Sequence, residues 1–405
     1  MRIAFIAPYV SNRAGPARVV ASLIDRLCQD HQITILAHSV EGIWLDKIRF
    51  HKVPTIASPR LLGNAIWLIS STITIAFLSL VTRRRFDIIH SHTYVGASFA
   101  NVITSHFCEI ECHRLENNGT IRIRHAGILQ SFRAFDDKLY RRSMVFAEKA
   151  VFGRKAARVR IVVSQRMKED FINHYGDAAR DVAVIPNGVD LEVFTPVNRQ
   201  AYRHSVRQEN GISDNDVLLL FVGGDWERKG LCFAIEALSL LPGSDVRLLV
   251  VGKGDKSFYS QLAESKRVEN RITFVSGKAN IREYYAASDI FLFPTLYEPF
   301  GLVILEAMAS GLPVITSRIA GAAELMNDGH DCLLLDDPTD APSIAEKISL
   351  LISSADVRDG MGRLARTTAE GFGWDKIAER TLQVYDRILE RKEGLLDNAK
   401  RPADR

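Results

Sequence analysis

Short apolar runs alternate along this chain with amphipathic stretches. Runs such as residues 3–7, 217–222 and 290–294 are typical of buried parallel strands, whereas residues 17–28 and 302–309 have the apolar spacing of a helix. The further predicted strands are residues 32–37, 49–54, 87–92, 102–107, 160–164, 247–252, 272–275, 312–316 and 331–335, and the further predicted helices are residues 126–155, 199–210 and 374–389. Strand and helix follow each other through most of the chain, which predicts an α/β fold.

One helical stretch is far more apolar than the rest. Residues 65–81 read AIWLISSTITIAFLSLV and are followed by three arginines. Seventeen residues is at the lower edge of a membrane span, and the run lies between strands of one predicted domain. Two interpretations stay open: a helix buried on one face that dips into a bilayer on the other, or a fully buried core helix.

Length and composition narrow the class of protein. A chain of 405 residues exceeds the size at which single cores stop growing, so we predict two domains of similar size. Its 47% hydrophobic and 25% charged residues are ordinary for a globular protein. Five cysteines do not make a disulfide framework and fit a reducing cytoplasm, and the opening MRIAFIAPYV fits a first strand, not a signal peptide.

The net charge of +4 is mild but unevenly distributed. Basic clusters occur at residues 83–85, 122–125, 138–142 and 154–160, all in the first half of the chain. They indicate either a surface that meets an anionic partner, such as phosphorylated lipid headgroups, or a solvated face that acids balance elsewhere.

The richest stretch for chemistry is DIFLFPTLYEPFGLVILEAMASGLPVITS. Glu298 and Glu306 are separated there by seven residues, so the first lies in a loop and the second about two turns into the helix. Carboxylates accept hydrogen bonds from sugar hydroxyls, and the amides of Phe300, Gly301 and Leu302 open the helix where an anion is favoured. On most helices such a pair is simply a solvated face, but one loop here could hold a nucleotide sugar.

A second candidate site follows the strand at residues 217–222. GGDWERKG places glycines at the strand end, then Arg228 and Lys229, and then a helix. A planar guanidinium and a point charge suit a diphosphate. The spacing is not that of a Walker A motif, and no G-x-G-x-x-G is present.

Candidate residues in the first half lie at strand ends. Gly15, in the turn after the first strand, lets the backbone approach a ligand at a helix start. His90, His92 and His106 follow strands, so we expect all three to point toward the cleft region.

The residues after His106 admit several interpretations. His106, Cys108, Cys112 and His113 resemble zinc ligands, but eight residues leave no loop to wrap them around one tetrahedral ion. The nearby acids could contact an acceptor, although surface charges are the simpler expectation: Glu109, Glu111 and Glu116.

Embedded in EPFGLVILEAMASGLPVI, the glutamate pair resembles the donor site of family 4 retaining glycosyltransferases, and the resemblance runs over nearly the whole chain. It implies the GT-B fold: two Rossmann-like, doubly wound domains facing across a cleft, with a C-terminal helix crossing back to the first domain. The implied division is an acceptor-binding domain at 1–186, a nucleotide-sugar-binding domain at 187–372, and the returning helix with a frayed tail at 373–405.

The same resemblance assigns roles to the candidate residues. Glu306 would hold the ribose hydroxyls, Glu298 with the amides after it would hold the transferred sugar, and Arg228 with Lys229 would neutralise the diphosphate. His106 would hydrogen-bond the reacting sugar. The implied catalytic residues are His106, Glu298 and Lys229, and the implied donor-binding residues are Gly15, Arg228, Lys229, Glu298, Phe300, Gly301, Leu302 and Glu306.

The chain departs from the family pattern at two loops. Most members carry a glycine pair where this chain has Ala14, Gly15 and Pro16, and many have an arginine where it has Gly224. The shape of the first loop therefore stays open, and the charge of the diphosphate falls to Arg228 and Lys229.

Within the family, the SVEG, YRHSVRQENGI and VGGDWERKG segments look most like lipopolysaccharide-core glucosyltransferases. The resemblance implies retaining transfer of a hexose from a nucleoside diphosphate sugar, in first place a UDP-sugar, to a saccharide or glycolipid acceptor. We expect no metal, cofactor or nucleic acid, and a cytoplasmic protein in peripheral contact with the inner membrane face. One alternative is a non-catalytic nucleotide-sugar-binding module of the same fold. A dinucleotide-dependent oxidoreductase is a weaker alternative, because the chain lacks the glycine fingerprint of such enzymes.

Overall fold

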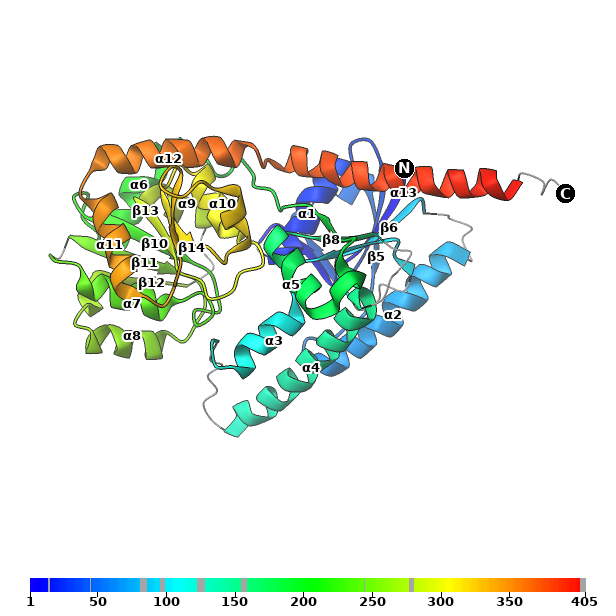
Figure 1. Cartoon of the computed structure of the whole chain (residues 1–405), viewed down its shortest axis with the longest axis horizontal. Helices are drawn as coiled ribbons and strands as arrows, with labels where there is room; N and C mark the ends of the chain where they lie inside the picture. The colour runs from blue at the N-terminus through cyan, green and yellow to red at the C-terminus, as the bar shows by residue number, and fades with distance from the viewer. Residues whose placement is uncertain are drawn as a thin grey trace. The chain divides into compact units, whose positions relative to one another are not determined.

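The computed structural model describes residues 1–13, 15–43, 45–80, 86–94, 99–121, 128–153, 159–243, 245–276 and 280–400. They form two compact units, each built on a parallel sheet with helices on its faces (Figure 1). Unit 1 comprises Met1–His113, Arg124–Asn187 and Trp374–Arg405, and unit 2 comprises Gly188–Gly373 together with Arg114–Ile123. The predicted two-domain α/β fold is confirmed.

The sheet of unit 1 has seven parallel strands. Their order is β5 (Ile48–Lys52), β3 (Gln32–Ala37), β1 (Arg2–Ile6), β6 (Ile88–Ser91), β7 (Val102–Ser105), β8 (Val159–Val162) and β9 (Ala183–Val184). A separate pair consists of β2 (Tyr9–Ser11) and β4 (Ser39–Glu41). Strand β1 is almost continuously apolar because both of its faces are covered, as is usual in parallel sheets.

The helices of the first half and the C-terminal helix complete unit 1. They are α1 (Gly15–Leu27), α2 (Arg60–Leu80), α3 (Glu109–Asn117, which passes into unit 2 from Arg114 on), α4 (Ile128–Phe152), α5 (Gln165–Tyr175) and α13 (Trp374–Lys400), with short 3₁₀ turns η1 (Leu45–Lys47) and η3 (Gly176–Ala179). Ser164 caps α5, since its hydroxyl accepts the amide of Met167 at 3.1 Å. Helix α13 packs against α1, and Arg26 and Asp375 form an ion pair between them.

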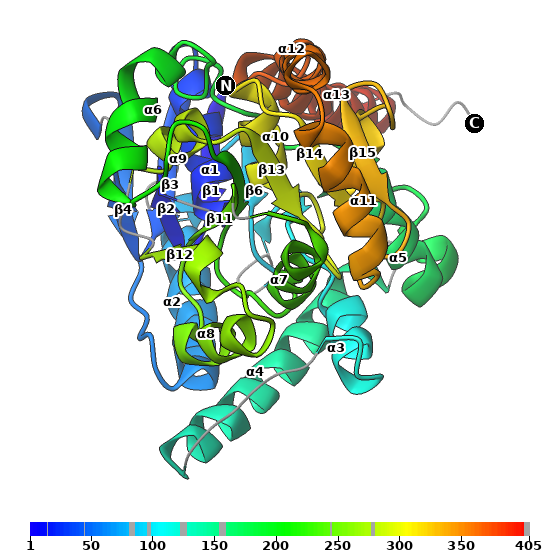
Figure 2. The same ribbon diagram turned by 90° about the vertical axis from the view of Figure 1, so that its left-hand side faces the viewer.

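The sheet of unit 2 has six parallel strands. Their order is β12 (Ile272–Val275), β11 (Val246–Val251), β10 (Val217–Val222), β13 (Ile290–Phe293), β14 (Val314–Ser317) and β15 (Cys332–Leu335). The helices are α6 (Asn198–Glu209), α7 (Leu231–Leu240), α8 (Lys256–Ser265), α9 (Ile281–Ala287), α10 (Leu302–Ala309), α11 (Ala341–Ile352) and α12 (Ala355–Glu370), with 3₁₀ turns η4 (Glu269–Arg271) and η5 (Gly321–Leu325). Helix α11 packs on α7, and α6 packs on α9 (Figure 2).

Both sheets have a point where the strand order reverses. In unit 1 the chain builds outward from β1 through β3 to β5 and then restarts on the other side of β1 with β6. In unit 2 it builds from β10 to β12 and restarts beside β10 with β13. Ligands of doubly wound folds bind beyond the carboxyl ends of the strands at these points.

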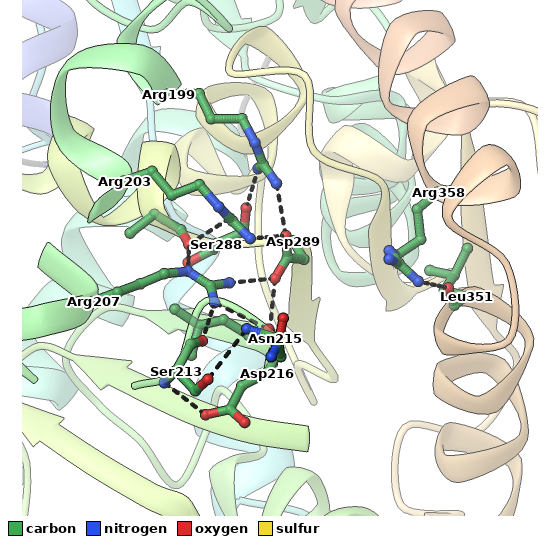
Figure 3. A network of polar contacts seen from close by, with 12 residues as sticks. Arg199, Arg203, Arg207, Ser213, Asn215, Asp216, Ser288, Asp289, Leu351 and Arg358 are labelled. Carbon is green, nitrogen blue, oxygen red and sulfur yellow. Dashed lines mark hydrogen bonds and ion pairs between the residues drawn. The ribbon is translucent and has the colours of Figure 1, made fainter. Parts of the chain in front are cut away.

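A buried ion cluster ties α6 to the strand next to the reversal in unit 2 (Figure 3). The Asp289 carboxylate, directly before β13, accepts the amide of Leu218 at 2.9 Å and pairs with Arg199, Arg203 and Arg207 at 2.8, 3.0 and 2.5 Å. Burial raises the pKa of Asp289, but Arg203, the Leu218 amide and the other arginines outweigh it, so the pKa lies below its ordinary value. The cluster fixes helix α6 to the sheet of unit 2.

Two predictions about elements are wrong, and one of two open interpretations is excluded. The sequence pattern predicts residues 160–164 as the last strand of the first domain, whereas β9 pairs with β8 beyond it. Residues 393–400 are not a frayed tail, because α13 continues to Lys400. A fully buried helix at residues 65–81 is excluded, because in α2 Trp67, Ile75 and Leu78 are buried whereas the opposite face is exposed.

Candidate active site

The site in unit 2 is built where two loops meet at the strand reversal. The first loop follows β10, and the second follows β13. Gly230 has a φ of +76°, and a Cβ on it would lie 1.9 Å from the carbonyl oxygen of Pro294. The carbonyl of Arg228 accepts the amide of Leu296 at 2.8 Å and the hydroxyl of Thr295 at 3.2 Å. Only glycine permits this close approach, which brings the Arg228–Lys229 pair beside the Glu298 loop.

Lys229 lies in the space that a neighbouring glycine leaves open. A Cβ on Gly223, whose φ is +128°, would lie 2.1 Å from the Lys229 Nζ. The ammonium stands 5.2 Å from the centre of the Phe293 ring, and no carboxylate in the described part of the chain forms an ion pair with it. Burial lowers the pKa of Lys229, while the more distant carboxylates, Glu298 first, act in the opposite direction. The result is a half-buried cation without a bonded counter-ion among the described residues.

Arg228 differs from its neighbour because the protein itself engages its guanidinium. Its Nε donates to Asp225 at 2.8 Å, and one terminal nitrogen donates to the carbonyl of Tyr297 and to Glu298, the latter at 3.3 Å. The side chain is 12% exposed. Arg228 therefore clamps the Glu298 loop onto the β10 loop, and its charge is partly neutralised there.

Glu298 and the start of α10 follow in the second loop. The Glu298 carbonyl accepts the amide of Gly321 at 2.9 Å, and the carbonyl of Phe300 accepts that of Ala322 at 2.7 Å, which pins the loop to η5. Gly301, with a φ of +98°, precedes Leu302, the first residue of α10. The first amides of a helix have no partner inside the helix and favour negative charge.

Glu306 is buried in α10 and is 3% exposed. Its Oε2 accepts the hydroxyl of Tyr285 at 2.9 Å, and the same hydroxyl lies 3.2 Å from the carbonyl of Val303. A surface charge is therefore excluded for this glutamate. Tyr285 in α9 orients the carboxylate, a role that sequence reasoning missed because 21 residues separate the two.

The structure separates the three histidines of unit 1 into two kinds. Both ring nitrogens of His90 are satisfied, by Tyr385 Oη at 2.6 Å and Thr104 Oγ1 at 2.7 Å, and its ring is 1% exposed. The expectation that His90 points toward the cleft is wrong, since it joins β6 to α13. His92 Nδ1 and His106 Nε2 lie 2.9 Å apart and form a pair.

Burial keeps these histidines neutral. It lowers the pKa of His90 to about 3 and that of His106 to about 4, and it lowers the pKa of His92 well below its ordinary value with a further contribution from His90. A neutral imidazole can donate one hydrogen bond and accept another. His106 is thus able to bind a hydroxyl but not to supply positive charge near neutral pH.

A buried carboxylate holds the segment just after His106. Glu148 of α4 is 0% exposed and accepts the amides of Glu109 and Ile110 at 2.6 and 3.2 Å, at the start of α3. The hydroxyls of Tyr175 and Tyr94 donate to it at 2.8 and 3.2 Å. Four donors and a helix start offset the cost of burying this charge, so α3 is docked on α4.

The acids of α3 have different environments. Glu111 is buried and lies 2.8 Å from His174, so the expectation of a surface charge is wrong for it. Burial and the neighbouring Glu148 raise the pKa of Glu109 to about 7. Glu116 is partly exposed. Among the described residues no group of His, Cys, Asp and Glu side chains is arranged to hold a metal ion.

The predicted site residues thus fall into two groups. Arg228, Lys229, Glu298, Phe300, Gly301, Leu302 and Glu306 come together in unit 2. His106 and Gly15 belong to unit 1, where Gly15 begins α1 with a φ of +60° and has open space around it. Asp225 was missed, although its position three residues before Arg228 could have indicated the ion pair.

Two family models together match most of the chain. "Glycosyltransferase Family 4" matches residues 13–193, and "Glycosyl transferases group 1" matches residues 203–368. The first includes Gly15 and the histidines, and the second includes every candidate residue of unit 2.

Curated relatives and solved structures agree with these models. A D-inositol 3-phosphate glycosyltransferase of Pseudarthrobacter chlorophenolicus is 29% identical over 321 residues, which are 77% of this chain and 73% of the relative. The lipopolysaccharide glucosyltransferase WaaG of Escherichia coli is 31% identical over 252 residues, 60% of this chain and 66% of the relative. The crystal structure of a WaaG superposes with a TM-score of 0.75 at 24% identity, covering 95% of this chain and 99% of that one. Anabaena HepE in complex with UDP-glucose superposes with a TM-score of 0.71 at 21% identity, covering 96% and 100%.

Proposed function

The chain belongs to the GT-B glycosyltransferases that the group 1 and family 4 models describe, which use nucleotide sugars, and we propose that it is a retaining, metal-independent hexosyltransferase. Its donor is a UDP-sugar. Its acceptor is a saccharide of a cell-surface polysaccharide or lipopolysaccharide, and the protein works in the cytoplasm at the inner membrane face.

The observation that carries this proposal is the half-buried ammonium of Lys229. It lies at the strand reversal of unit 2, in the loop that Arg228 ties to Glu298 ahead of α10, and has no ion-paired carboxylate among the described residues. Burying a charge is costly unless an anion compensates it. A diphosphate bound between Lys229 and the start of α10 supplies that compensation.

The neighbouring residues then take distinct parts in the transfer. Negative charge builds on the leaving diphosphate as the bond to the sugar breaks, and Lys229 with the α10 amides stabilises it electrostatically. Arg228 keeps Glu298 beside this charge, so that the carboxylate can accept sugar hydroxyls. Tyr285 orients Glu306 toward the ribose hydroxyls. His106, neutral at physiological pH, hydrogen-bonds the reacting sugar.

The acceptor class is supported by the relatives and by the surface of unit 1. One relative is named as a lipopolysaccharide glucosyltransferase, although others are named for inositol phosphate. Helix α2 is long and apolar enough to cross a membrane by length and composition alone, yet 28% of its most apolar window is buried in the protein. Its exposed side is a stripe at helical spacing: Leu62, Ile69, Ile73, Phe77 and Leu80.

The neighbouring helix adds charge to this apolar stripe. Helix α4 packs against α2, and the amides of Arg60 and Leu61 donate to Asp136 of α4 (Figure 1). Exposed residues along one side of α4 are aromatic or basic: Phe135, Lys138, Arg142, Phe146 and Lys149. The basic clusters at residues 83–85, 122–125 and 154–158 lie outside the described residues. An apolar stripe on one helix, with aromatic and basic side chains on the helix packed against it, fits an anionic bilayer on which the protein lies without spanning it.

The test of the donor is turnover with a panel of UDP-, GDP- and ADP-sugars, each with and without a lipopolysaccharide-core saccharide, measured as nucleotide release. We expect acceptor-dependent release from a UDP-sugar. The anomeric configuration of the product, read by NMR, must match that of the donor, since an inverted product would exclude the retaining assignment. Tight donor binding without release for any sugar and acceptor would support the non-catalytic module instead.

Metal independence is tested by chelation. Because Lys229 and helix amides already oppose the diphosphate charge, we expect nucleotide release to continue in EDTA. Loss of activity that manganese or magnesium restores would show the metal-free assignment to be wrong.

A further inference from the structure

The pair formed by His92 and His106 has a property that follows from hydrogen-bond counting. His92 Nδ1 lies 2.9 Å from His106 Nε2, and the two rings are inclined by 15°. The other nitrogens, His92 Nε2 and His106 Nδ1, are buried without a hydrogen-bond partner among the described residues. The two histidines therefore share one hydrogen bond, and each has a second ring nitrogen that forms no hydrogen bond with the described residues.

Only two proton arrangements satisfy this geometry when both rings are neutral. If His92 Nδ1 donates, His106 Nε2 must be bare and its Nδ1 carries the proton. If His106 Nε2 donates, His92 Nδ1 must be bare and its Nε2 carries the proton. In either case the two rings adopt the same tautomer, and the pair presents one N–H and one lone pair to its surroundings.

We propose that His92 is a positioning residue that couples the tautomer of His106 to its own, so that both rings carry the proton on the same nitrogen. The rest of the site holds His92 in place: its ring stacks on Phe5 at 5.8 Å and lies tilted by 33° against the ring of His90 at 4.2 Å between ring centres. His90 is in turn fixed by Thr104 and Tyr385. Low pKa values of the histidines, caused first by burial, keep the pair neutral, so the counting above applies over the physiological range.

The consequence for catalysis rests on the proposed function, in which His106 binds the reacting sugar. A sugar hydroxyl can donate or accept, and the tautomer of His106 decides which of the two it does. A mixture of tautomers would leave part of the protein with the wrong partner facing the sugar. This effect changes turnover more than donor affinity, because the diphosphate and ribose are bound in unit 2.

The tautomers of His92 and His106 can be determined by NMR, without an assay of enzyme activity. In the full-length protein labelled with ¹⁵N-histidine, long-range ¹H–¹⁵N correlation spectra distinguish Nδ1–H from Nε2–H rings, and a His106→Gln variant assigns the His106 signals. We expect His92 and His106 to show the same single tautomer. Opposite tautomers, or a His106 tautomer unchanged in His92→Phe, would overturn the proposal even if the enzyme is active.

Matched variants separate the hydrogen bond from the packing. Asn places a polar group at the distance of a histidine Nδ1, Gln places it at the distance of Nε2, and Phe keeps the ring alone. We expect His92→Asn, whose amide still offers His106 Nε2 a hydrogen-bond partner, to retain most of kcat, whereas His92→Gln and His92→Phe lower kcat about tenfold with a donor KM within about twofold. Equal losses in the Asn and Gln variants would assign His92 a packing role. If the His92→Phe variant fails to fold, the comparison of His92→Asn with His92→Gln still separates the hydrogen-bonding role from the packing role.

Failure of this inference is distinct from failure of the proposed function. A protein that releases no nucleotide from any sugar, but shows matched tautomers that His92→Gln abolishes, has the positioning pair without the assigned chemistry. A protein that transfers sugar normally in all three His92 variants has the chemistry without the positioning role.

Discussion

At the scale of residues, Arg228 and Lys229 differ in their partners, and this difference determines which role we expect for each in the unit 2 site. The two cations are adjacent in sequence, but Arg228 is engaged by Asp225, Glu298 and a carbonyl, whereas no described carboxylate pairs with Lys229. We therefore expect Arg228 to act mainly through the loop that it holds and Lys229 to act on the ligand.

Removing the Lys229 ammonium should cost most of the activity. Lys229→Ala deletes a charge-assisted contact that strengthens in the transition state, so we expect kcat/KM to fall by roughly 10² or more. Steady-state nucleotide release measures it, with Lys256→Ala, an exposed lysine of α8, as the matched control. Near-normal turnover of the Lys229→Ala variant would show that Lys229 does not bind the diphosphate of the donor.

Two adjacent glycines offer a sharper test of the same contact. In Gly223→Ala the new Cβ takes the space of the Lys229 ammonium, and φ at +128° disfavours any side chain, whereas the Cβ of Gly224→Ala meets only a carbonyl at 3.4 Å. We expect Gly223→Ala to raise the donor KM at least about tenfold and Gly224→Ala to change it less than about twofold. Titration calorimetry with UDP checks both, and equal affinities would contradict the placement of Lys229.

Residue types near a site could be read from the sequence, but their partners could not. The run of glycine, arginine and lysine after an apolar strand indicated a diphosphate loop, and the glutamate spacing indicated the second loop. That Glu298 pairs with Arg228, 70 residues earlier, depends on strand order, which periodicity does not reveal. His90 and His92 share one sequence pattern, and only the positions of Thr104 and Tyr385 separate their roles.

At the scale of elements, the pieces that long apolar patterns define were predicted well. Helix α10 and strands β3, β10 and β12 have the predicted bounds, since each is an apolar run bounded by polar or turn residues. Strand β9 has two residues and lacks enough pattern to be recognised. The length of α13 was underestimated because its last residues are polar, and propensity alone does not show where such a helix ends.

The Asp289 cluster predicts a graded loss of stability at the junction of α6 and β13. The arginine side chains that pair with it are 1% exposed in Arg207, 22% in Arg203 and 43% in Arg199. Arg207→Ala leaves a buried carboxylate short of a partner, and we expect the free energy of unfolding to fall by about 3–5 kcal/mol. Arg199→Ala should cost less than about 1 kcal/mol, because water replaces its contact.

Urea unfolding of the three alanine variants measures this order. The expected ranking of the losses is Arg207, then Arg203, then Arg199. A loss for Arg199→Ala as large as that for Arg207→Ala would show that burial does not set the strength of these pairs.

At the scale of the whole molecule, one exposed apolar helix face requires a partner of its own. Ile69, Ile73 and Phe77 of α2 are 60%, 63% and 54% exposed, although the helix is mostly apolar. A soluble surface rarely keeps such a contiguous apolar stripe without a function.

Sedimentation with liposomes tests whether this stripe and the α4 cations meet a bilayer. We expect binding to anionic vesicles that weakens as salt increases, since each Lys or Arg near the surface contributes about 1 kcal/mol. Ile73→Asp should reduce binding at every salt concentration, and Lys138→Glu combined with Arg142→Glu should reduce it mainly at low salt.

The opposite results are also informative. Absence of binding to anionic and neutral vesicles at low salt would contradict the membrane proposal, and resistance to high salt and carbonate would mean that α2 inserts. A matched change on the buried side is unsuitable as a control, because Ile75 is in the core of unit 1. Val357→Asp, on an exposed site of α12, is the control for added charge.

The membership of α13 in unit 1 sets an order for synthesis. The ribosome makes the α13 residues after all of unit 2, yet α13 belongs to the same compact unit as β1, and Tyr385 of α13 is the fully buried partner of His90. Unit 2 therefore has all its residues before unit 1 does, which inverts the usual N-terminal-first order of folding during translation. Until α13 has been synthesised, unit 1 of the nascent chain is incomplete, with the α1 surface and His90 uncovered, although all residues of unit 2 are already present.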